Sequence, residues 1–223
     1  MSAVRTEDLI QEMVRDARPV RRLASPVWRL ALWLGPSLLS SAAIVQAMGL
    51  RPDIQEKLAE PTYVIEVVAA LLTGVLAGLA ALCATYPGRP VWERFAPLPP
   101  LAVWLGSLGD GCWRTLMRMG PDGLHFMPDL ICFPTILIVG ALPAFLIFRM
   151  VRRGAPTAPV STMALAALAA AALGAAALRL FHPQDASVMV LVWQFGSVAL
   201  LTLLGAAAGQ RILRWPISQL RSN

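Results

Sequence analysis

Two cysteines are the residues of this chain whose chemistry stands out first. Cys112 and Cys132 bracket the stretch "GCWRTLMRMGPDGLHFMPDLIC". Two thiols in an oxidising compartment can form a disulfide, and thiolates bind soft metal ions together with Met and His side chains such as His125. Arg114 and Arg118 nearby would favour the thiolate and so raise its reactivity. Three interpretations stay open: a redox-active or thiol-sensing pair, a structural disulfide, and simple packing.

No enzyme and no bound cofactor are predicted. The candidate metal ligands are Cys112, His125 and Cys132, but their spacing matches no recognised zinc pattern. The chain also lacks the motifs HExxH, GxSxG and GxxxxGK[ST], which mark zinc proteases, serine hydrolases and nucleotide phosphate loops.

Six apolar segments must position the cysteines. Of the 223 residues, 57% are hydrophobic and only 14% are charged, whereas about a quarter of the residues of a soluble domain are charged. Runs of about 20 apolar residues, the length that crosses a bilayer, recur between breaks rich in Pro and Gly. We therefore expect an all-α integral membrane bundle of six transmembrane helices within residues 28–213. The segments lie near residues 28–49, 62–86, 95–109, 131–150, 160–181 and 187–213.

The basic residues predict how this bundle is oriented. The net charge is +6, and 14 of the 19 Lys and Arg residues fall in the N-terminal tail, the second and fourth loops and the C-terminus. Loops rich in Lys and Arg stay in the cytoplasm, so both termini are expected there and the cysteine stretch on the outer side. Because these charges flank membrane segments, direct contact with nucleic acid is not expected.

Three features within the apolar segments carry further expectations. Segment 95–109 is short and begins with prolines, and without it the C-terminus would change sides. A charged residue such as Glu66 is costly in an apolar segment. Because Glu66 lies near the predicted outer end of segment 62–86, it can face lipid headgroups or pair with Arg51. Segment 160–181 is rich in Ala, so it is expected to pack closely against its neighbours.

The N-terminal tail, residues 1–27, differs from everything after it. Placed on a helix that Pro19 would end, "DLIQEMVRDARPV" shows one apolar stripe of Leu9, Ile10, Met13, Val14 and Ala17. A tail this short cannot build a core alone, so the stripe docks in a partner's groove, lies on the membrane or stays disordered. Its acidic first turns would be repelled by anionic lipid, which favours a protein partner. Residues 214–223 are expected to form a second cytoplasmic tail.

Several stretches resemble the NrsF family of membrane anti-sigma factors, negative regulators of sigma F. The likeness runs in order through "TEDLIQEMVRDARPVRRL", "GLRPDIQEKLAEPTYVIEVVAALLTGVLAGLAA", "GCWRTL", "PDLICFPTILIVGALPAFLIFRMVRRGAP" and "ALRLFHPQDASVMVLVWQFG". It implies six transmembrane helices and a cytoplasmic N-terminal segment that holds an extracytoplasmic-function sigma factor inactive. It also implies two outer cysteines tied to stress sensing, here Cys112 and Cys132, and places Asp16, Pro19 and Val20 in the sigma-binding segment.

The sequence thus predicts an anti-sigma factor of the bacterial inner membrane whose partners are a sigma factor and the lipid bilayer. Its N-terminal segment would sequester the sigma factor, and oxidative or heavy-metal stress sensed at the two outer cysteines would release it. The predicted sigma-binding residues are Leu9, Ile10, Met13, Val14, Asp16, Pro19 and Val20. The alternative is a small multi-pass transporter or metal-handling membrane protein that uses the Cys, Met and His side chains of the outer stretch.

Overall fold

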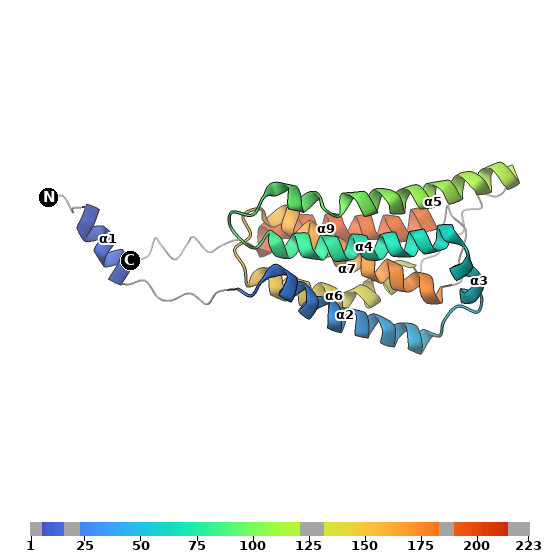
Figure 1. The fold of residues 1–223 in the computed structure, drawn as a ribbon, viewed down its shortest axis with the longest axis horizontal. Helices are drawn as coiled ribbons and strands as arrows, with labels where there is room; N and C mark the ends of the chain where they lie inside the picture. Colours follow the sequence, from blue (N-terminus) through green and yellow to red (C-terminus); the bar gives the residue numbers. More distant parts are fainter. Residues whose placement is uncertain (1–5, 16–22, 121–131, 183–189, 214–223) are drawn as a thin grey trace.

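The computed structural model describes residues 6–15, 23–120, 132–182 and 190–213, and the regular elements in these ranges are all helices (Figure 1). They are α1 (Thr6–Arg15), α2 (Pro26–Met48), α3 (Ile54–Ala59), α4 (Pro61–Cys83), the 3₁₀ helix η1 (Val91–Phe95), α5 (Leu98–Met119), α6 (Cys132–Arg152), α7 (Pro159–Phe181), the π-helical turn η3 (Val190–Phe195) and α9 (Gly196–Ile212).

Six long helices run up and down along one another. In Figure 1, α2, α5 and α7 run in one direction, and α4, α6 and α9 return. We call the end of the bundle where α2 begins and α9 ends the tail end, and the opposite end the far end. The first helix of the bundle therefore begins at the same end at which the last one ends.

Five helices among the described residues are long and apolar enough to cross a membrane. They span Pro26–Met48, Pro61–Cys83, Phe133–Arg152, Pro159–Phe181 and Leu191–Gly209. Five of the six predicted segments are thus found as candidate membrane spans, while segment 95–109 is not.

Helix α5 stands where that segment was expected, but it differs in extent and composition. It continues about ten residues beyond the predicted end, to Met119, and its last turns extend past α4 and α7 at the far end in Figure 1. Its 22 residues make a rod of about 33 Å. Its second half carries Asp110, Arg114 and Arg118, so its composition is not that of an apolar span. Trp104 and Leu108 are buried against the bundle, so the side of α5 that carries them faces the other helices.

Prolines and glycines set the ends of several helices, as their local chemistry dictates. Proline lacks the N–H that a first helical turn leaves unpaired, and Pro61 and Pro159 begin α4 and α7. The N–H of Trp28 donates to the hydroxyl of Ser25, which caps α2. At the end of α5, Gly120 adopts a φ of 63°, a conformation that glycine reaches without steric cost.

Helix α7 lies at the centre of the bundle and packs against α4, α6 and α9. Small residues allow this, because a Cβ added to Gly174 would come within 2.9 Å of the Ile136 carbonyl on α6. One added to Gly209 of α9 would come within 2.6 Å of the Pro159 carbonyl. The Ala-rich segment is therefore the closely packed core helix that its composition predicted.

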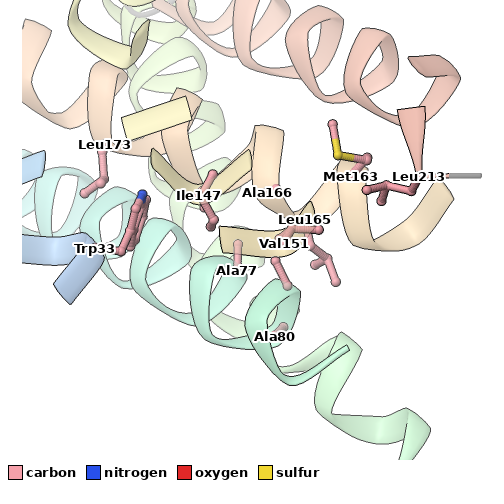
Figure 2. Close-up of a cluster of buried hydrophobic side chains, with 12 residues drawn as sticks. Trp33, Ala77, Ala80, Ile147, Val151, Met163, Leu165, Ala166, Leu173 and Leu213 are labelled. Carbon is pink, nitrogen blue, oxygen red and sulfur yellow. The ribbon is translucent and has the colours of Figure 1, made fainter. Parts of the chain in front are cut away.

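A cluster of apolar side chains joins α2, α4, α6 and α7 toward the tail end (Figure 2). Trp33 is fully buried, and its indole N–H donates to the carbonyl of Pro143 at 2.9 Å. Its ring fills the space beside Gly78, where an added Cβ would lie 2.7 Å from a ring carbon. This contact fixes the distance between α2 and α4.

Candidate functional site

The first candidate surface is the apolar stripe of α1. Its four large side chains in the described range are between 49% and 68% exposed, and no residue of α1 is buried. They are Leu9, Ile10, Met13 and Val14. The other predicted sigma-binding residues, Asp16, Pro19 and Val20, lie outside the described residues. Helix α1 therefore presents an uncovered apolar face.

At the tail end, a buried arginine anchors the chain that leads into α2. The Arg29 guanidinium donates to the Thr85 hydroxyl at 2.8 Å and to the carbonyl of Met150, and it lies over the Tyr86 ring. The Tyr86 hydroxyl donates in turn to the carbonyl of Ala24. The residues just before α2 are thus fastened to the ends of α4 and α6.

At the far end, a buried ion pair joins α4 to the central helix. The Glu66 carboxylate lies 2.8 Å from the Arg179 guanidinium, and both side chains are 8% exposed. The Tyr63 hydroxyl donates to the main-chain carbonyl of Arg179 at 2.8 Å, and the guanidinium lies over the Tyr63 ring. Glu66 thus has a charged partner inside the bundle, and our expectation that it faces headgroups or pairs with Arg51 did not identify that partner.

The turn that follows α2 adds a second arginine to this cluster. Arg51 is almost fully buried and donates two hydrogen bonds of 2.7 Å to the Asp53 carboxylate. These hydrogen bonds lower the pKa of Asp53 from 3.8 to about 2. The main-chain N–H of Arg51 also donates to the Leu180 carbonyl at 3.0 Å, and its guanidinium faces the Tyr63 ring. The connection between α2 and α3 is therefore held against the end of α7.

A polar cavity of about 500 Å³, which we call the far-end cavity, opens beside this cluster. Residues of α3, α4, α5 and α7 line it, together with Glu60 between α3 and α4. Its charged lining residues are Lys57, Glu60, Glu66, Arg114, Arg118 and Arg179. Cationic side chains therefore outnumber acidic ones in its wall.

The two predicted sensing cysteines lie in helices that flank the intervening stretch. Cys112 is a free, partly buried thiol two turns before the end of α5, and it directly follows Gly111, which lines the far-end cavity. Cys132 is the first residue of α6, and its side chain is outside the described part, as is His125. The described residues include no group of three or more His, Cys, Asp and Glu side chains arranged to hold a metal.

The Glu66–Arg179 pair is the feature that sequence reasoning missed. Each residue is the one charged side chain of its apolar segment, Glu66 in residues 62–86 and Arg179 in residues 160–181. Two isolated charges of opposite sign in different membrane segments are expected to pair, because an unpaired charge there is costly. Arg179 lies near the end of its segment, so counting charges by loop hides this signal.

Comparison with known proteins identifies the family. Residues 13–215 match the family model described as NrsF, negative regulator of sigma F. The chain is 28% identical over 224 residues to the anti-sigma-F factor NrsF of Caulobacter vibrioides (strain NA1000 / CB15N), covering 95% of this chain and 100% of that protein. No solved structure matches the fold. Members of the family are regulators rather than enzymes. The chain belongs to the NrsF family of anti-sigma factors.

Proposed function

We propose that this protein holds an extracytoplasmic-function sigma factor inactive at the bacterial inner membrane through its N-terminal segment, residues 1–27. The exposed stripe of α1 is the observation that supports the proposal best. Burying an apolar side chain of this size stabilises a complex by up to about 1.5–3 kcal/mol, so a groove that covers Leu9, Ile10, Met13 and Val14 gains several such contributions. Asp16, Pro19 and Val20 belong to the same proposed binding segment.

The proposed orientation places both tails in the cytoplasm and the far end outside. Helix α5 serves as the sixth membrane segment, since it is long enough to cross and its buried Trp104 and Leu108 pack on the bundle. Its polar second half then reaches the outer surface. With this orientation residues 1–27 and 214–223 are both cytoplasmic, on the side where a sigma factor meets RNA polymerase.

Release is proposed to begin at Cys112 and Cys132 on the outer side. An oxidant that accepts two electrons converts two thiols into a disulfide with loss of two protons, and a soft heavy metal replaces the thiol protons instead. Either change alters how α5 and α6 pack at the far end. A tenfold drop in sigma-factor affinity requires only about 1.4 kcal/mol. The contacts of Arg29 and Tyr86 support the transmission of this packing change to the N-terminal segment, because they tie the start of α2 to the ends of α4 and α6.

The stripe is tested by a pair of matched variants in the native cells. Leu9→Asp with Met13→Asp places charges on the apolar stripe, whereas Glu7→Gln with Glu12→Gln changes the polar side of the same helix. Transcript sequencing is expected to show one set of genes raised without stress in the stripe variant and unchanged in the control. Equal transcript profiles for the two variants, at equal membrane abundance, would contradict the proposal.

A further inference from the structure

We propose that the far-end cavity binds an oxoanion, such as a phosphate, sulfate or carboxylate group, through Arg114 and Arg118. This ligand site goes beyond sigma-factor binding and does not depend on it. The cavity of about 500 Å³ has the size typical of small-molecule sites, roughly 300–1,000 Å³.

The charges of the cavity wall indicate the ligand's sign. Of the two acidic side chains, Glu66 is paired with Arg179 at 2.8 Å and Glu60 with Lys57 at 2.9 Å. The acids of the wall are therefore already matched by cations from the same wall. The two arginines of α5 remain, and they add positive charge that no acid of the wall neutralises.

These two arginines differ in their partners. Arg114 makes an ion pair of 2.8 Å with Asp110 on its own helix, and both side chains are largely exposed. An exposed pair of this kind is weak, so a bound anion can compete with Asp110 for the guanidinium. Arg118 lines the cavity and has no ion pair or hydrogen bond with any described residue.

The spacing of the arginines fits an oxoanion. Residues four apart lie next to each other on a helix, where two like charges repel, and an anion between Arg114 and Arg118 would remove that repulsion. The planar guanidinium donates two parallel hydrogen bonds to carboxylate, sulfate or phosphate oxygens. Hydroxyl and amide ligands carry no negative charge to match the positive charge of the two arginines. An oxoanion is therefore the class of ligand that fits the cavity wall.

Two sources can supply such a group. The cavity lies at the far end of the apolar spans, where the headgroup of an anionic phospholipid and a dissolved ion both have access. In either case the anion would lie close to the backbone that leads from Gly111 to Cys112. Binding would hold α5 against α3 and α4, and thereby set the position of the thiol.

The test measures binding by the purified full-length protein, without any sigma factor. In a neutral maltoside detergent, inorganic phosphate and sulfate are titrated by calorimetry. In nanodiscs, retained phosphatidylglycerol is compared with phosphatidylcholine by native mass spectrometry. Each probe is applied to the wild type, to Arg118→Gln, and to Arg153→Gln, which removes an exposed arginine at the tail end. Equal melting temperatures show that the variants are folded, as expected for two exposed side chains.

Arg118→Gln is expected to weaken binding about tenfold or more, whereas Arg153→Gln leaves it unchanged. Binding of phosphate or sulfate in detergent supports a dissolved ion as the source, and selective retention of phosphatidylglycerol alone supports a lipid headgroup. The proposal is overturned if no probe binds, if Arg118→Gln binds every probe as the wild type does, or if both variants lose affinity equally.

Discussion

Replacing Glu66 by Gln tests whether the ion pair at the far end holds the bundle together. The change preserves the side-chain size but leaves the Arg179 guanidinium, 8% exposed, without its negative partner. Removing one partner of a buried ion pair costs about 3–5 kcal/mol. Both residues also line the far-end cavity, where water can solvate part of the charge. We therefore expect a loss of about 2–3 kcal/mol of unfolding free energy.

The loss is measured by circular dichroism while a denaturing detergent is titrated into the purified protein until it unfolds. The measurement is made for Glu66→Gln, Arg179→Gln and the double variant. The double variant is expected to lose clearly less than the sum of the two single losses, because the pair acts as a unit. Asp110→Asn is the matched control: its pair with Arg114 has the same 2.8 Å separation but side chains 44% and 60% exposed, so about 0–1 kcal/mol is expected. The reasoning is refuted if Glu66→Gln costs no more than Asp110→Asn, or if the two single losses simply add.

Three further predictions concern other parts of the chain. Gly78→Ala is expected to lower the unfolding free energy by about 1–3 kcal/mol because its methyl group meets the buried Trp33 ring, whereas Gly106→Ala, with open space around it, keeps or slightly raises stability in the same titration. Cys112→Ser and Cys132→Ser are each expected to abolish stress-induced expression of the sigma-dependent genes, and normal induction in both would refute thiol sensing. Asp53 has a pKa of about 2 in the folded protein, below its ordinary value of 3.8, so its stabilising contribution is present above pH 3.8 and is lost as the pH falls toward 2. The melting temperatures of the wild type and Asp53→Asn are therefore expected to converge between pH 3.8 and pH 2. A constant difference between them would contradict the lowered pKa of Asp53.

The apolar helices were predictable because their signals are local. Each apolar segment is bounded by Pro, Gly or charged residues, and five of the six meet the length and hydropathy of a membrane span. The extent of α5 was not predicted, because Gly106, Gly109 and the charges from Asp110 onward resemble a loop. The helix nevertheless continues, since Asp110 and Arg114 pair one turn apart along its surface and Trp104 and Leu108 pack on the bundle.

The far-end cluster could not be predicted in detail because its contacts are distant in sequence. Glu66 and Arg179 are 113 positions apart, and they meet only because α7 takes the centre of the bundle beside α4. Helical periodicity shows neither which helix is central nor how two helices align lengthwise. The α1 stripe, by contrast, depends only on spacing within ten residues, and its four large side chains are exposed.

The central claim is that the N-terminal segment captures a sigma factor. The most direct measurement is a co-purification from the native cells, with the full-length protein and a variant lacking residues 1–24 solubilised in parallel and their bound proteins identified by mass spectrometry. Our account predicts that a sigma factor accompanies the full-length protein and is absent from the truncated one. Identical sets of bound proteins, with both forms folded and equally abundant in the membrane, would contradict it and turn attention to the transporter or metal-handling alternative.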